Sequence, residues 1–119
     1  MKHLILLLVV LLNAIAASAA CTPDDYDRRQ AESYMREAEY YRKKADSYRR
    51  EADYYMKKAE SYQREAAYYT RRGDADRAKY YLRQADRSMD NYKTQMRYAK
   101  NADEKAADYL RRASDRLRR

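Results

Sequence analysis

The feature that most constrains this chain is a 14-residue repeat that runs three times without interruption, from residue 31 to residue 72. Fourteen residues make two heptads, and each heptad has alanine at its first position, a, and tyrosine three residues later, at position d. The alanines are Ala31, Ala38, Ala45, Ala52, Ala59 and Ala66. The tyrosines are Tyr34, Tyr41, Tyr48, Tyr55, Tyr62 and Tyr69. Because the resulting Ala/Tyr stripe must be buried, the repeat predicts a helix that supercoils left-handed against a partner helix.

The polar positions of the repeat also favour a helix. Five acidic residues each precede a basic residue by four positions, and such a pair contributes about 0.2–0.5 kcal/mol to a helix. The pairs are Glu32–Arg36, Glu39–Lys43, Asp46–Arg50, Asp53–Lys57 and Glu60–Arg64. Position g, the last of the heptad, alternates between acidic and basic residues. That alternation disfavours slipped registers, because a slip would bring like charges together.

The only glycine of the chain divides this periodic region. Arg71 and Arg72 precede Gly73, and Asp74 follows it. A basic last turn, a glycine and an aspartate are typical of one helix that ends and a second that begins. We therefore predict a turn at Gly73 and Asp74. The alternative is one continuous helix of about 90 residues, which tolerates the glycine at a cost of about 1 kcal/mol.

The seven-residue period continues after the glycine. One row comprises Ala78, Ala85, Tyr92, Ala99, Ala106 and Ala113, and a second comprises Leu82, Met89, Met96, Asp103, Leu110 and Leu117. Two helices, 26–72 and 75–118, would each be about 65–70 Å long at 1.5 Å per residue. Joined by a tight turn, they predict an all-α fold, a long antiparallel two-helix hairpin with coiled-coil Ala/Tyr heptads. Such a thin hairpin could pair further into a four-helix bundle.

The composition agrees with a thin seam and excludes most enzyme chemistry. From Cys21 onward there is no Ile, Val, Phe or Trp to fill a globular core. The only His is His3, and the chain has one Cys and one Gly. These counts exclude a His-dependent nucleophilic triad, a His/Cys zinc site and a glycine-rich phosphate loop. We expect no enzymatic activity, no catalytic residues, no metal and no cofactor.

Residues 1–20 have the layout of a secretory signal peptide. Lys2 lies in a short basic start, residues 4–12 are an unbroken apolar run, and residues 13–20 are small and rich in alanine. This order of segments predicts export. The apolar run falls short of the roughly 20 residues that span a membrane, and an uncleaved N-terminal anchor is the alternative.

The end of this segment resembles a bacterial lipobox. Ser18-Ala19-Ala20 precede Cys21, although Ser18 stands where leucine is usual. The resemblance implies that Cys21 is acylated, that residues 21–25 form a short tether, and that Thr22 directs sorting to the outer membrane. Because Cys21 is the only cysteine, no intramolecular disulfide can form. Cleavage after Ala19, or an intermolecular disulfide, is the alternative.

Two groups of residues are candidates for contact with a partner. Tyr40, Tyr54 and Tyr68 lie at position c, beside the d tyrosines and near basic residues. They could stack on aromatic or sugar rings or relay electrons, and the simpler interpretation is packing within the hairpin or a subunit interface. The second group is the arginines near the end of the sequence: Arg111, Arg112, Arg116, Arg118 and Arg119. They fit either a helix C-terminus that complements the dipole or contact with an anionic surface.

These features predict a structural or interaction protein of the cell envelope. Lys2 is the only basic residue before Cys21, so the remaining 26 basic and 19 acidic residues give a net charge of +7. This charge favours an anionic partner such as lipid or cell-wall polymer. Acylation at Cys21 would give a membrane-anchored, self-associating lipoprotein of the outer membrane or periplasm. Its layout is similar to that of Braun-type small lipoproteins, but the terminal lysine that they attach to peptidoglycan is absent here.

Two other functions follow if parts of this interpretation fail. Without acylation, the same helices would suit a soluble periplasmic or secreted binding protein that, like a chaperone, binds an acidic or aromatic partner. Nucleic-acid binding through Arg and Tyr conflicts with export, so we expect no nucleic-acid partner.

Overall fold

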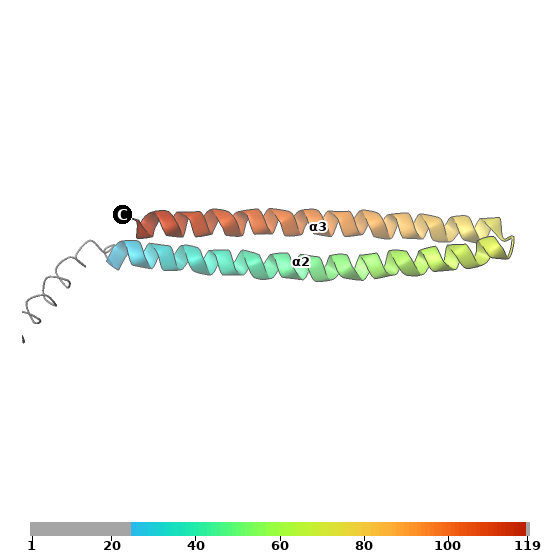
Figure 1. Ribbon diagram of the computed structural model, residues 1–119, viewed down its shortest axis with the longest axis horizontal. Helices are drawn as coiled ribbons and strands as arrows, with labels where there is room; N and C mark the ends of the chain where they lie inside the picture. Colours follow the sequence, from blue (N-terminus) through green and yellow to red (C-terminus); the bar gives the residue numbers. More distant parts are fainter. Residues whose placement is uncertain (1–24, 119) are drawn as a thin grey trace, which may run out of the picture.

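The computed structural model describes residues 25–118, which form two antiparallel helices lying side by side along their whole length (Figure 1). Helix α2 is Asp25–Arg71 and helix α3 is Ala75–Leu117. They have 47 and 43 residues, so they are about 70 and 65 Å long at 1.5 Å per residue. The prediction of a long all-α hairpin is confirmed. The signal segment, Cys21 and Arg119 lie outside the described residues.

The turn is built by the glycine and the aspartate that the sequence places there. The N–H of Gly73 donates to the carbonyl of Thr70 at 3.1 Å, and the N–H of Asp74 donates to that of Tyr69 at 2.9 Å. This pair of bonds is a Schellman motif, which needs a left-handed residue after the helix. Gly73 has φ +79° and meets that need. The Asp74 carboxylate then accepts from the N–H of Arg77 at 3.1 Å and caps α3.

Replacing Gly73 by alanine distinguishes the hairpin from a continuous helix, because the change should lower the stability of the first and raise that of the second. Gly73→Ala should destabilise the hairpin by about 1–2 kcal/mol, because alanine is strained in the left-handed region. No atom lies within 4 Å of the position its Cβ would take, so backbone strain alone sets the cost. In a continuous helix the same change would stabilise by about 1 kcal/mol. Thermal unfolding followed by circular dichroism decides between them, and Gly73→Asn should lose less than Gly73→Ala.

The buried residues of the seam between the helices are almost all alanine. The six a-position alanines of α2 are 0–3% exposed. In α3 the buried residues are Ala78, Ala85, Ser88, Ala99, Ala102, Ala106 and Ala113. The d-position tyrosines of α2 are half-buried. Because alanine is small, the two backbones approach closely, and no large side chain among the described residues is fully buried.

The second row of α3 in the seam begins one residue earlier than the Leu/Met row of the sequence. It comprises Tyr81, Ser88, Gln95, Ala102, Tyr109 and Arg116, all buried or half-buried. These residues follow the a position by three, as the d tyrosines do in α2. The Leu/Met row follows it by four and lies beside the seam, where Leu82 and Leu110 are 50% and 48% exposed. Both rows share the seven-residue period, so the period alone does not separate them.

The surface ion pairs also differ from the expected spacing. Of the five i,i+4 pairs, only Lys57 and Asp53 lie within ion-pair distance, at 3.0 Å. Arginine instead turns back to an acid three residues earlier, as Arg42 does to Glu39 at 3.4 Å and Arg49 to Asp46 at 3.0 Å. These groups are largely exposed to water, so each pair contributes little to stability.

Candidate functional site

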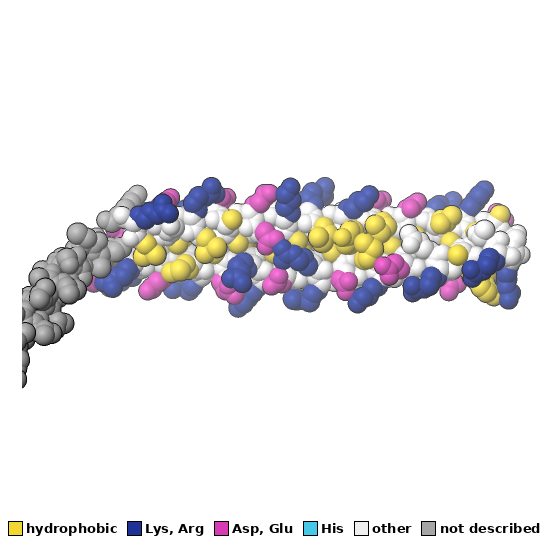
Figure 2. Space-filling view, in the orientation of Figure 1, with side chains coloured by type: hydrophobic (Ala, Val, Ile, Leu, Met, Phe, Trp, Pro, Cys, Tyr) yellow, Lys and Arg dark blue, Asp and Glu magenta, His cyan; other side chains and the backbone are white. Residues whose placement is uncertain are grey.

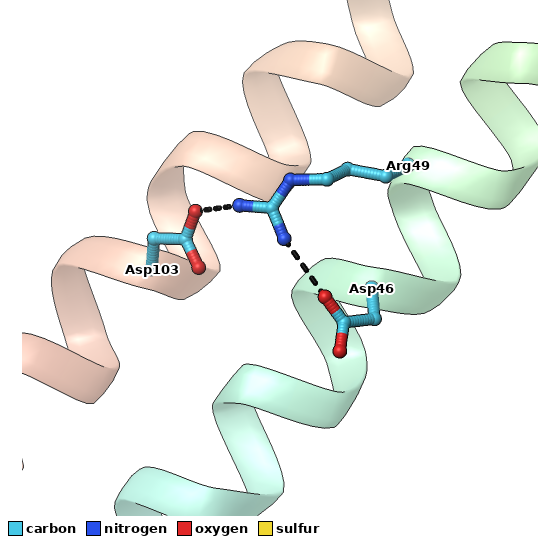
Figure 3. Close-up of polar contacts among 3 residues, drawn as sticks. All are labelled: Asp46, Arg49 and Asp103. Atoms are coloured by element: carbon cyan, nitrogen blue, oxygen red, sulfur yellow. Dashed lines mark hydrogen bonds and ion pairs between the residues drawn. The ribbon is translucent and has the colours of Figure 1, made fainter.

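The two sides of the hairpin carry different chemistry, and one ion pair across the seam shows which positions share a side. The guanidinium of Arg49 donates to the carboxylates of Asp46 and Asp103, and so joins α2 to α3 (Figure 3). Arg49 and Asp103 both follow an a position by four, at position e. The e positions of both helices therefore lie on one side of the seam, and by helix geometry the c and g positions lie on the other.

The side that carries positions c and g is lined with tyrosine, and we call it the tyrosine face. Rings meet across the helices at two places in nearly parallel stacks. Tyr69 lies on Tyr81 with centroids 5.5 Å apart and an interplanar angle of 2°, and Tyr41 lies on Tyr109 at 5.8 Å and 9°. Tyr48 contacts Tyr98 at 5.5 Å. Such ring pairs contribute about 0.5–1.5 kcal/mol beyond the area they bury.

Each repeat of α2 builds the same unit on this face. The c and d tyrosines meet edge to face, with centroids 5.2, 5.3 and 5.1 Å apart in the pairs Tyr40–Tyr41, Tyr54–Tyr55 and Tyr68–Tyr69. A cation four residues after each c tyrosine lies over its ring: Lys44 at 5.5 Å, Lys58 at 5.6 Å and Arg72 at 4.7 Å. The c tyrosines stay 54%, 53% and 39% exposed. The outer ring and the cation of each unit are therefore accessible to a partner.

Helix α3 adds three further residues to this face, of which the sequence analysis selected Arg112 but not Tyr80 or Lys105. Tyr80 meets Tyr81 edge to face at 5.2 Å, as in the α2 units. Lys105 lies 5.3 Å from the Tyr41 ring and Arg112 lies 5.3 Å from the Tyr109 ring. The signal that could have found Lys105 is the g-position row 98, 105 and 112, which places an aromatic and two cations seven residues apart. Tyr80 could have been found at position c, directly before Tyr81 at position d, as in the repeat of α2.

The arginines near the end of the sequence do not form one patch. Arg116 faces the seam and pairs with Asp27 of α2 at 3.3 Å, with both side chains largely buried. Arg111 pairs with Asp108 on the outer surface, and Arg112 belongs to the tyrosine face. Arg118 contributes its N–H to the carbonyl of Ser114 at the end of α3. Because these arginines lie on different sides of the hairpin, one anionic surface could not contact all of them at once.

The pKa values of two side chains in the seam, Tyr81 and Arg116, are shifted by their surroundings. Burial raises the pKa of the Tyr81 phenol, and the phenol of Tyr69 and the carboxylate of Glu65 raise it further. The hydrogen bond to Asp27 raises the pKa of the Arg116 guanidinium, which burial lowers in part. Arg116 therefore remains charged and fixes the open end of the hairpin, whereas Tyr81 remains neutral through the physiological range.

The Tyr81 shift makes the hairpin sensitive to alkaline pH. Because the folded pKa lies above that of the unfolded chain, the contribution is fully present below about pH 10. It is lost as the pH rises through the folded pKa, since ionisation then favours the unfolded chain. Titration followed by tyrosinate absorbance should show a late-ionising phenol that is missing in Tyr81→Phe. The variant should also lose less of its melting temperature between neutral and alkaline pH. Tyr26→Phe, at the exposed end of α2, is the control, and equal behaviour of the two variants would contradict the assignment.

The opposite side of the hairpin is mostly aliphatic. Seven of its twelve e positions carry Met or Leu: Met35, Met56, Leu82, Met89, Met96, Leu110 and Leu117. The other five are Arg42, Arg49, Gln63, Thr70 and Asp103. Several of these are well exposed, including Met35 at 42% and Leu117 at 45%. Figure 2 shows a face on which hydrophobic side chains gather along the line between the helices, with charged side chains along both edges and a few that interrupt the line itself. A second hydrophobic surface could cover such a stripe.

Other classes of site are not found in the part of the chain that the structure describes. Within residues 25–118 no cluster of His, Cys, Asp and Glu could hold a metal ion. Neither α2 nor α3 is long and apolar enough to cross a membrane. Comparison with protein-family models, with curated proteins and with solved structures gives no match. The tyrosine face is therefore the candidate site on its own chemistry.

Proposed function

We propose that this chain is an exported, non-enzymatic interaction protein of the cell envelope, anchored through an acylated Cys21. Its hairpin presents the tyrosine face to anionic envelope components, either lipid headgroups or cell-wall polymer. The observation that carries the proposal is the unit of two tyrosines and one cation that recurs every 14 residues along α2. A regular row of such units suits a polymer or a surface better than a single small molecule.

The charges of these units support an anionic partner. Lys44, Lys58, Arg72, Lys105 and Arg112 all lie over tyrosine rings. None of the five has an acidic group within ion-pair distance in residues 25–118. Basic residues near an anionic membrane each contribute about 1 kcal/mol of attraction. Five cations on one face are therefore enough to orient the hairpin on such a surface.

Self-association is the second part of the proposal. The Ala/Tyr seam is occupied within the hairpin, so a second copy would pack on the aliphatic side and not on the alanines. There Leu82, Met96 and Leu110 are 38–50% exposed. Pairing two hairpins through this side would produce a four-helix bundle and leave the tyrosine faces outward.

A soluble periplasmic or secreted binding protein is the second candidate function. The exposed methionines favour it, because methionine side chains adapt their shape to different apolar partners. Met35 and Met96 are 42% and 38% exposed on the aliphatic side. In that case the aliphatic side would bind client proteins, and Cys21 would not be acylated.

Binding to vesicles tests the role of the tyrosine face. Cys21→Ser protein, expressed with its own N-terminal segment, should sediment with vesicles that contain phosphatidylglycerol and not with phosphatidylcholine vesicles. Binding should weaken as salt rises, because screening reduces the attraction between charges. Replacing Lys58, Arg72 and Arg112 by glutamine should weaken it strongly.

The matched control removes the same charge from the outer surface. Arg36, Arg50 and Arg64 lie at position f, away from both the seam and the tyrosine face. Their triple replacement by glutamine should weaken vesicle binding much less. Equal losses in the two triple variants, or equal binding to neutral vesicles, would contradict a directed basic face.

A further inference from the structure

The tyrosine face contains a hollow beside Ala102, a small residue of α3. Four of the six d tyrosines of α2 lie against a tyrosine of the matching row of α3: Tyr109 contacts Tyr34 and Tyr41, and Tyr81 contacts Tyr62 and Tyr69. Between Tyr81 and Tyr109 this row carries Ser88, Gln95 and Ala102, and Ala102 is the member next to Tyr109. A hollow of about 120 Å³ opens there, lined by Tyr41, Lys44, Tyr48, Tyr98, Asn101, Ala102 and Lys105.

The charges around this hollow are of one sign. Lys44 and Lys105 both line it, at position g of their helices, and no acidic residue does. Residues at g usually pair with opposite charges and thereby fix register and orientation. The nearby carboxylate of Asp108 is engaged by Arg111. At this hollow the g residues of both helices are cations, so they cannot pair with each other and both charges are open to an anion.

Both ammonium groups are held near the hollow by tyrosine rings. Lys44 lies 5.5 Å from the centroid of Tyr40, and Lys105 lies 5.3 Å from that of Tyr41. A hydrogen bond with Tyr40, and then the charges that the Tyr40 and Tyr48 phenols acquire on ionisation, raise the pKa of Lys44. Lys44 is therefore available as a cation at neutral pH, and the amide of Asn101 adds a neutral donor.

The size of the hollow limits what it can hold. Sites for whole drug-sized ligands have volumes of roughly 300–1,000 Å³, so this one accepts a single ring or a terminal group. Tyr48 and Tyr98, with centroids 5.5 Å apart and planes inclined by 57°, supply apolar walls. Two ammonium groups beside aromatic walls match a ring that carries a phosphate or a carboxylate.

We propose that Tyr41, Tyr48 and Tyr98, together with Lys44 and Lys105, bind the anionic sugar end of an envelope molecule. The sugar ring lies against the tyrosines, and its phosphate or carboxylate is held between the two ammonium groups. This inference rests on the proposed function for the location of the ligand, but its chemistry is testable in solution. A lipid headgroup and a cell-wall polymer can both present such an end.

The first experiment titrates Cys21→Ser protein with glucose 1-phosphate and follows amide and tyrosine signals by NMR. Shifts should concentrate at the residues that line the hollow. Glucose and inorganic phosphate, each offering half of the ligand, should bind more weakly. Lys44→Gln and Lys105→Gln should each weaken binding about tenfold or more, which is the effect of losing one charge-assisted hydrogen bond.

Lys43→Gln is the matched control, because Lys43 precedes Lys44 in the sequence but lies at the outer position f and does not line the hollow. It should leave the affinity unchanged, with circular dichroism confirming that all variants are folded. Equal weakening by Lys43→Gln, or equal binding of glucose, would overturn the site. Vesicle binding is a separate readout: if it fails while glucose 1-phosphate still binds, the site stands and the proposed lipid surface is wrong. If vesicles bind and the sugar phosphate does not, the site is wrong.

To identify the source of the ligand, vesicles that contain a glycolipid with a phosphorylated sugar headgroup, and a soluble anionic cell-wall polymer, compete against bound glucose 1-phosphate. Displacement by the polymer assigns the site to the wall, and displacement by the glycolipid vesicles assigns it to lipid headgroups. Displacement by neither would overturn the proposal that an envelope molecule occupies the hollow.

Discussion

Ala52→Leu should destabilise the hairpin by about 1–3 kcal/mol, although it adds a hydrophobic side chain to a coiled-coil seam. Ala52 lies at the middle of α2 and is 1% exposed. The facing row of α3 is also mostly alanine, so the close approach of the backbones leaves no space for the extra carbon atoms. Leucine would force the helices apart and disturb the tyrosine stacks on either side. A loss of this size should lower the melting temperature by roughly 4–8 °C per kcal/mol.

The control for this prediction makes the same substitution outside the seam. Ala67 lies in α2 but is exposed, and leucine and alanine have similar helix propensities. Ala67→Leu should therefore change stability by no more than about 0.5 kcal/mol. If Ala52→Leu stabilised the protein, or matched Ala67→Leu, the closely packed alanine seam would be wrong. Unfolding by heat or urea, followed by circular dichroism, measures both variants.

The heptad pattern was sufficient to predict the hairpin and its turn. Six alanines at strict spacing allow only one stripe of α2 to be buried, and Gly73 followed by Asp74 allows one place for the chain to reverse. These are local signals with a direct physical cause, since period sets the buried face and a left-handed residue ends a helix. No knowledge of the second helix was needed for either.

The second row of α3 could not be assigned from its period. Tyr81 and Leu82 begin rows with the same seven-residue spacing, and hydrophobicity favours the leucine row. Which row enters the seam depends on the side from which α2 approaches. The structure places Tyr81 against Tyr69 and leaves Leu82 half exposed. Which row enters the seam is therefore set by the tertiary packing. Because the tyrosine row enters it, the Leu/Met row stays outside and forms the aliphatic side of the hairpin.

The candidate site was only half visible in the sequence for the same reason. Tyr40, Tyr54 and Tyr68 are evident as a repeat within one helix. The hollow beside Lys44 instead needs Lys105 and Ala102 from α3, about 60 residues further along the chain, and only the register set by the turn brings them together. Arg116 shows the converse: its partner Asp27 lies near the start of α2, at the same open end of the hairpin, and this pairing makes Arg116 a structural residue.

Cys21→Ser should release the protein from the membrane fraction almost completely. An acyl chain contributes about 0.8 kcal/mol per buried CH₂, and one chain alone gives only marginal binding, so a basic surface is a useful second signal. Without the anchor, the cations of the tyrosine face remain, but their attraction is weakened by physiological salt. Residual binding of Cys21→Ser should therefore disappear at high salt, whereas the wild type should stay in the membrane.

The most direct test of the account is the intact mass and membrane partition of the wild type, expressed in a bacterium with its own N-terminal segment, beside Cys21→Ser. The account predicts that the wild type begins at Cys21, carries the added mass of acyl groups and sediments with membranes. It predicts that Cys21→Ser lacks that mass and is found in the soluble fraction. A wild type that is soluble, unacylated and cleaved near Ala19 or Ala20 would contradict the anchored envelope protein and favour the soluble binding protein.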